Sequence, residues 1–106
     1  MARKILGQAY PGPGQLIDLY TVPGGKSATG SSVVACNQGT TEASFRIAVA
    51  KAGASGTSKQ YLYYDTPISA RDSFIATIGF TLSETDVLRC YSATGLVSFN
   101  VFGDES

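Results

Sequence analysis

Few of the side chains that commonly carry out catalysis occur in this sequence. It contains no histidine, which is the commonest general base and the commonest metal ligand in proteins. The two cysteines, Cys36 and Cys90, are too few for a zinc site, which takes four nitrogen or sulfur ligands, or three and a water molecule. We therefore predict that the chain has no metal site, no cofactor and no catalytic pair of serine or cysteine with histidine.

Carboxylates are the remaining groups that could perform acid–base chemistry. The sequence has eight of them: Asp18, Glu42, Asp65, Asp72, Glu84, Asp86, Asp104 and Glu105. A pair at the right separation can hydrolyse a glycosidic bond, but most of these residues fall in expected turns or in the polar tail, where a solvated charge is the ordinary situation. No segment has the ligand spacing of an EF-hand calcium loop. We predict that the protein is not an enzyme.

Two features could contact phosphate or nucleic acid. Residues 23–27, Pro-Gly-Gly-Lys-Ser, share part of a phosphate-loop pattern, but no helix is expected after them to supply N-terminal amides, so a hairpin turn is predicted. Tyr61, Tyr63 and Tyr64 lie close to Lys59, and tyrosine rings can stack on bases. However, eight basic residues balance eight acidic ones, so no positive field attracts nucleic acid or an anionic membrane. We favour packing or protein contact for these tyrosines and predict no nucleic acid and no membrane as partners.

The sequence favours a cytoplasmic origin. Its basic beginning lacks the ~7–15 apolar residues of a signal peptide, and no segment approaches the ~20 apolar residues of a membrane helix. We expect the protein to be made and kept in a cytoplasm, or in something assembled there. In a reducing compartment Cys36 and Cys90 are predicted to be free thiols, although the sequence leaves a disulfide between them open.

The elements that position these residues are short strands. Apolar residues alternate with polar ones or form short runs in residues 15–22, 31–37, 44–50, 60–65, 74–82, 87–92 and 96–102. Residues 74–82 are the clearest case, because every second residue from Phe74 to Leu82 is apolar. About seven short strands separated by turns indicate an all-β fold, an antiparallel β-sandwich of jelly-roll-like type. The predicted core is Phe45, Ile47, Val49, Phe74, Ile78, Phe80, Leu82, Leu88, Phe99 and Val101.

The first 14 residues differ in composition from the rest. Prolines at 11 and 13 remove backbone donors and hold the residues before them extended. We predict an extended N-terminal arm over residues 1–14 and a single β-sandwich domain over residues 15–106. The arm is expected to contact a neighbouring subunit or an underlying shell; the alternative is a terminus that frays or covers the end of its own sandwich. The interface candidates in the arm are Ile5, Leu6, Tyr10, Pro11 and Pro13.

A second set of interface candidates lies on the expected strands. If Leu88 and Cys90 face the core, Arg89 and Tyr91 face outward together, and both residue types are enriched at protein interfaces. Arg89 can equally lie over a covered sheet face with its stem packed against it, so both interpretations stay open. The strand candidates are Tyr61, Tyr63, Arg89 and Tyr91.

Several segments resemble a known class of proteins. They are residues 19–25 (LYTVPGG), 59–65 (KQYLYYD), 78–82 (IGFTL), 86–91 (DVLRCY) and 98–103 (SFNVFG). Over roughly residues 15–103 this succession of strands and turns is similar to small virion proteins of tailed bacteriophages, which are capsid cement or decoration proteins, or accessory domains of tails and fibres. The resemblance implies a structural protein without catalytic residues.

The function predicted from the sequence is that of a non-enzymatic phage virion structural protein, first of all a capsid cement or decoration protein that stabilises the shell by protein–protein contacts. The alternative is a tail or fibre accessory domain; a carbohydrate-binding module comes third, because the sequence has no tryptophan. The implied partners are the major capsid protein or tail proteins, and further copies of the chain as a homo-oligomer, since a thin core and low net charge favour self-association. The expected location is the virion, assembled in the host cytoplasm.

Overall fold

The chain forms strands along most of its length. The computed structural model describes the backbone of residues 2–106 and the side chains from Lys4 onward. Nine strands occur within these residues: β1 (Ala2–Ala9), β2 (Gln15–Thr21), β3 (Ala28–Asn37), β4 (Ala43–Ala50), β5 (Tyr61–Ile68), β6 (Ser73–Ala76), β7 (Phe80–Leu82), β8 (Val87–Ser92) and β9 (Val97–Glu105). Two single-turn 3-10 helices, η1 (Lys51–Gly53) and η2 (Ser58–Gln60), lie in the connection between β4 and β5. The prediction of an all-β fold is confirmed.

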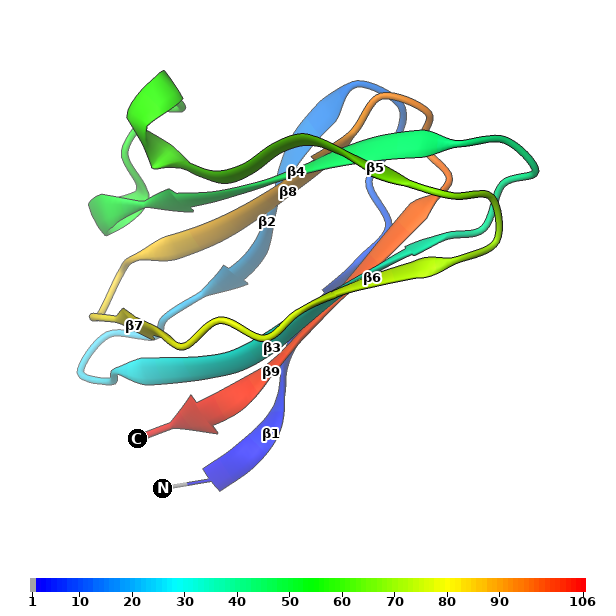
Figure 1. Cartoon of the computed structure of the whole chain (residues 1–106). Helices are drawn as coiled ribbons and strands as arrows, with labels where there is room; N and C mark the ends of the chain where they lie inside the picture. The colour runs from blue at the N-terminus through cyan, green and yellow to red at the C-terminus, as the bar shows by residue number, and fades with distance from the viewer. Residues whose placement is uncertain (1) are drawn as a thin grey trace.

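The strands form two antiparallel sheets in two layers (Figure 1), an arrangement compatible with the predicted β-sandwich. The sheet that we call the β9 sheet has the order β1-β9-β3-β6, with β7 also paired to β3. The other, the β8 sheet, has the order β2-β8-β4-β5. Connections cross from one sheet to the other except between β4 and β5 and between β6 and β7. Strands that are neighbours in a sheet therefore come mostly from distant parts of the sequence.

The core lies between the sheets and takes alternate residues from their strands. Phe45 in β4 and Phe99 in β9 are fully buried, and their ring centroids are 6.1 Å apart. Within the predicted core, the buried residues are Phe45, Ile47, Leu82, Leu88, Phe99 and Val101, and those partly buried against them are Val49, Phe74 and Phe80. Ile78 is only half-buried, in the connection between β6 and β7.

The strand predicted over residues 74–82 is interrupted. β6 and β7 both pair with β3, but residues 77–79 lie opposite only residues 31–32 of that strand. The extra residue breaks the ladder, as in a β-bulge. Next to this break the ring of Phe80 covers Gly30, where a Cβ atom would overlap the ring. The alternating pattern thus predicts strand at both ends of the segment but does not reveal the break between them.

Residues 2–9 of the expected arm form β1, which is an edge strand of the β9 sheet. Its pairing with β9 runs from Ala2, opposite Glu105, to Ala9, opposite Phe99. The backbone donors and acceptors of β9 would otherwise lack partners along this side, and β1 supplies them. At Gly7 the strand runs so close to β2 that a Cβ atom would overlap the carbonyl oxygen of Leu19. The segment is extended, as predicted, but it contributes a strand to the main fold.

The connection from β1 to β2 is anchored as it crosses between the sheets. Pro11 is fully buried, and the Gly14 amide donates to the Ser92 carbonyl at 2.9 Å. Pro13 lies against the turn between β8 and β9, where a Cβ atom on Gly95 would come within 2.6 Å of the proline Cδ. The proline-rich segment therefore packs on the fold instead of projecting from it.

Candidate functional site

Four strands bring a row of large side chains to the outer face of the β8 sheet. Leu16 in β2 lies opposite Tyr91 in β8, and Tyr91 lies opposite Arg46 in β4. Their neighbours along each strand, Cys90 and Ile47 among them, are buried in the core. Because successive strand residues point to opposite faces, the row points away from the core.

A bulge in the edge strand β5 completes this row. Residues 63–66 of β5 lie opposite residues 45–47 of β4, which leaves one extra residue in β5. Asp65 adopts a positive φ of 51° there. Two consecutive residues, Tyr64 and Asp65, consequently both contact Arg46, whereas in a regular strand they would face opposite sides. The name Tyr–Arg cluster is used below for Arg46, Tyr61, Tyr64, Asp65 and Tyr91.

Arg46 lies at the centre of the Tyr–Arg cluster. Its Cζ is 4.0 Å from the centroid of the Tyr64 ring and 4.5 Å from that of Tyr91, within the range of a cation–π contact. Asp65 accepts two hydrogen bonds from it, from Nε at 2.7 Å and from Nη2 at 3.2 Å. The hydrogen bonds from Arg46 hold the pKa of the Asp65 carboxyl below its usual value. The cluster therefore combines three tyrosine rings with one ion pair whose charges balance.

Two hollows open to solvent on either side of the Tyr–Arg cluster. The first, of about 330 Å³, is lined by Leu16, Gly56, Thr57, Ser58, Tyr61 and Tyr64. The second, of about 430 Å³, has Glu42, Ser44, Arg46, Asp65, Tyr91 and Thr94 among its lining residues. Both volumes are at the lower end of the range of small-molecule sites.

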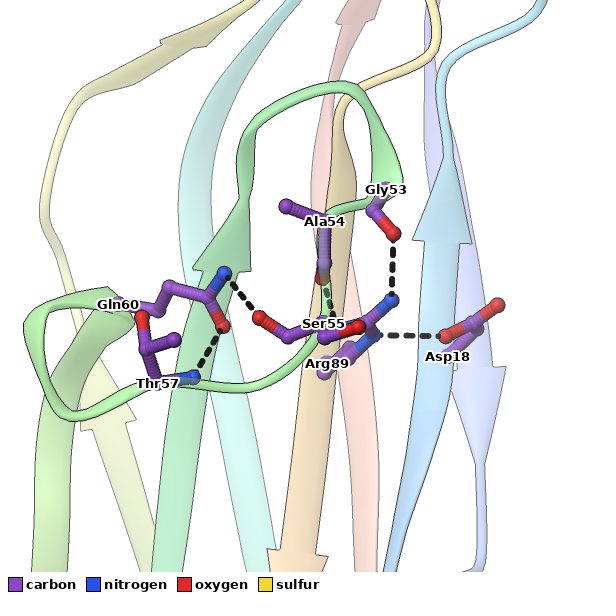
Figure 2. A network of polar contacts seen from close by, with 7 residues as sticks. All are labelled: Asp18, Gly53, Ala54, Ser55, Thr57, Gln60 and Arg89. Atoms are coloured by element: carbon purple, nitrogen blue, oxygen red, sulfur yellow. Dashed lines mark hydrogen bonds and ion pairs between the residues drawn. The ribbon is translucent and has the colours of Figure 1, made fainter.

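The loop between β4 and β5 lies over the outer face of the β8 sheet and is fastened there by Arg89 (Figure 2). Arg89 donates from Nη1 to the Ala54 carbonyl at 2.8 Å and from Nη2 to the Gly53 carbonyl at 3.3 Å. Its Nε pairs with Asp18 Oδ1 at 3.1 Å. Only 15% of the Arg89 side chain remains exposed. Arg89 therefore lies between the sheet and this loop, and little of its side chain is accessible to another protein.

Gln60 shapes the same loop from its other end. Its side-chain amide donates to the Ser55 carbonyl at 3.0 Å, and its Oε1 accepts from the Thr57 amide at 3.2 Å (Figure 2). The second of these bonds is part of a capping box around η2, in which the Thr57 side chain also accepts from the Gln60 backbone amide. Since Gly56, Thr57 and Ser58 line the first hollow, Gln60 and Arg89 together fix one of its walls.

The outer face of the β9 sheet has a different character. Ile5 in β1 lies opposite Phe102 in β9, and Val34 in β3 lies opposite Ile75 in β6. Ile5 is 50% exposed and Ile75 is 64% exposed, while Val34 and Phe102 are half-buried. We call these four residues the apolar face. Near one end of it, Lys4 and Glu105 form an ion pair at 3.0 Å.

The structure places the remaining interface candidates in several environments. Tyr10 and Pro13 are exposed, Leu6 packs partly against the core, and Tyr61 and Tyr91 belong to the Tyr–Arg cluster. Tyr63 points to the core, with its ring centroid 5.8 Å from that of Phe45 and 5.4 Å from that of Phe74.

Sequence reasoning missed the residues that link these candidates. Arg46 was not among the interface candidates, although its alternation with Phe45 and Ile47 already turns it outward. Tyr64 was considered only together with Tyr61 and Tyr63. Phe102 and Ile75 of the apolar face were also missed, because each lies in a strand whose neighbours are known only once the sheet order is known.

The described part of the chain contains neither a group of metal-ligating side chains nor a long apolar helix. Among the described side chains, no three His, Cys, Asp or Glu residues come together to hold an ion. Cys36 and Cys90 are both free thiols, as predicted. The part of the chain described has no helix with the length and apolar character required to cross a membrane. Comparison with protein-family models, with curated proteins and with solved structures finds no match.

Proposed function

We propose that this protein is a non-enzymatic structural protein of a tailed-phage particle, and specifically a capsid cement or decoration protein. The observation that carries the proposal is the apolar face. Ile5 pairs with Phe102 and Val34 pairs with Ile75 on the outside of one sheet, and Ile75 is 64% exposed. Fully burying one such side chain contributes roughly 1.5–3 kcal/mol, so contact with another protein surface is favourable for this face.

The strand order supports the more specific assignment of a jelly roll. A chain that winds eight strands into two Greek keys places them as two four-stranded sheets of interleaved order. The orders β1-β9-β3-β6 and β2-β8-β4-β5 have this form if β6 and β7 count as one strand, since both pair with β3. Viral capsid domains and lectins use jelly rolls. Because one fold serves many functions, the proposed function rests on the apolar face and not on the jelly roll.

The partner in this proposal is a protein of the virion shell, with tail proteins as the alternative. The same face serves either partner, so copy number separates the two roles. A cement protein occurs in hundreds of copies per particle and a tail accessory domain in a few. Quantitative mass spectrometry of purified particles gives this number directly, and absence of the chain from particles would refute both roles.

A pair of variants tests whether the apolar face makes the contact. We expect Ile75→Asp to abolish rebinding of the purified protein to particles that lack it, because a carboxylate would be buried without a partner. Leu62→Asp is the matched control, since Leu62 is also exposed, at 45%, but lies on β5 in the other sheet. Both variants should keep the melting temperature of the parent. Equal rebinding of the two variants would exclude the apolar face as the contact.

A further inference from the structure

The ring of Tyr64 has one face on Arg46 and the other toward solvent. The Arg46 Cζ lies 4.0 Å from the ring centroid, so the guanidinium occupies one face. Tyr61 meets the ring edge-on, with centroids 5.0 Å apart and an interplanar angle of 84°. With these two contacts made, 59% of Tyr64 is still exposed to solvent. A ring that is already held in place loses little conformational freedom when a ligand stacks on it.

The charges beneath this ring are matched within the protein. Asp65 accepts from Arg46 at 2.7 Å, so the pair presents no net charge that would favour a phosphate or a carboxylate. The Asp65 side chain is still 47% exposed, and its oxygens have further lone pairs to accept hydrogen bonds. The polar groups at the edge of Tyr64 therefore suit a neutral ligand that carries hydroxyls.

The two hollows beside the ring favour the same kind of ligand. Thr57 and Ser58 contribute hydroxyls to the first hollow, and Ser44 and Thr94 contribute them to the second. The two most exposed aliphatic residues of the apolar face, Ile5 and Ile75, which a protein partner would bury, lie on the other sheet. The two hollows and the Tyr64 ring together form an elongated surface. An extended ligand with apolar ring faces and many hydroxyl groups fits that surface.

We propose that Tyr64 is the stacking platform of a sugar-binding site that takes a neutral pyranose unit of an oligosaccharide. The CH-rich face of the sugar ring lies on the open face of Tyr64, and its hydroxyls bond to Asp65 at the edge of the ring. The adjoining sugar units extend into the two hollows. This site is independent of the proposed role in the virion, which uses the opposite side of the molecule.

Isothermal titration of the full chain with neutral hexasaccharides tests the proposal. The probes are the hexamers of β-linked glucose, α-linked glucose, β-linked mannose and β-linked N-acetylglucosamine. We expect at least one to bind with a Kd below about 1 mM. Tyr64→Ala should weaken that binding at least about tenfold, while Tyr64→Phe, which keeps the ring, should stay within about threefold of the parent. Leu62→Ala, on the same strand, is the control and should bind as the parent does.

Two results would overturn the sugar site. One is a failure of all four hexasaccharides to bind; the other is unchanged binding by Tyr64→Ala at an unchanged melting temperature. If Tyr64→Ala instead loses attachment to particles while no sugar binds, the surface is a protein contact and the sugar proposal is wrong. The Ile75→Asp variant distinguishes the proposed virion role from the sugar-binding site, because it should lose particle binding and retain sugar binding.

Discussion

The hydroxyl of Tyr20, in β2, donates a hydrogen bond to the carboxylate of Glu105, in β9, and so joins the two sheets at one end of the fold. Tyr20 is 8% exposed, and Glu105 also pairs with Lys4 of β1 at 3.0 Å. The hydrogen bond from Tyr20, followed by that from Lys4, holds the pKa of the Glu105 carboxyl below its usual value. Burial and the same hydrogen bond raise the pKa of the Tyr20 hydroxyl.

This contact predicts a loss of stability in acid. A carboxyl whose pKa is lower in the folded state stabilises the fold above its unfolded pKa, which is about 4.5 for Glu105. That stabilisation is lost as the pH falls through the lower, folded pKa. We expect Tyr20→Phe to have a lower melting temperature than the parent at pH 7 and a smaller difference at about pH 3. A difference that does not change with pH would show that the hydroxyl acts independently of the Glu105 charge.

Two phenylalanines should differ in their contribution to stability. Phe99→Ala removes a fully buried ring and is expected to lower the free energy of unfolding by about 3–5 kcal/mol. Phe80→Ala should cost less, because Phe80 is only partly buried and packs over Gly30 near the break between β6 and β7. Urea unfolding followed by circular dichroism measures both values. Equal losses would mean that Phe80 belongs to the core proper.

Deleting residues 2–9 should destabilise the fold and promote aggregation. The deletion leaves one side of β9 without a hydrogen-bonding partner, and an open edge strand pairs readily with other chains. Calorimetry and light scattering detect the two effects. Ile5→Ser is the control that keeps β1 but alters an exposed side chain. If the deletion leaves the melting temperature unchanged and abolishes self-association, β1 acts as a detachable arm between subunits.

Arg89 and its partner Asp18 should differ in their contribution to the free energy of unfolding. Arg89→Ala removes two hydrogen bonds to loop carbonyls and is expected to cost about 1–3 kcal/mol of unfolding free energy. Asp18→Ala removes only an exposed ion pair, with the Asp18 side chain 60% exposed, and should cost less than about 1 kcal/mol. Hydrogen exchange at residues 53–58 should accelerate in the first variant only. Similar exchange in both would show that Arg89 does not hold the loop.

Local patterns in the sequence account for the strands but not for the sheets. Alternation around Phe45 and in residues 87–92 predicts β4 and β8 closely, because each strand has one face against the core. Sheet order depends on contacts between strands far apart in the chain, and no local pattern carries it. The sequence pattern therefore predicts an arm where β1 lies, because β1 pairs with the distant strand β9.

Irregularities in the ladders explain why the candidate site was found only in part. Tyr61 and Tyr91 could be predicted as interface candidates because both are tyrosines on expected strands. Tyr63 faces the core, whereas Tyr61 and Tyr64 face outward, because the pairing of β5 with β4 shifts register on both sides of Tyr63. Such shifts leave no mark on composition. Arg46 became recognisable as the centre of the site only when the register placed it opposite Tyr91.

The position of β9 between β1 and β3 has a consequence for how the molecule is made. During synthesis β1 leaves the ribosome first, yet its only partner in the sheet consists of residues 97–105, which leave last among the described strands. The β9 sheet therefore cannot form until residues 97–105 have been made. Until then, the edges of β1 and β3 that pair with β9 lack hydrogen-bonding partners. The described strands therefore fold together only once residues 97–105 have been made, and an interruption of translation before these residues leaves strands that are prone to pair with those of other nascent chains.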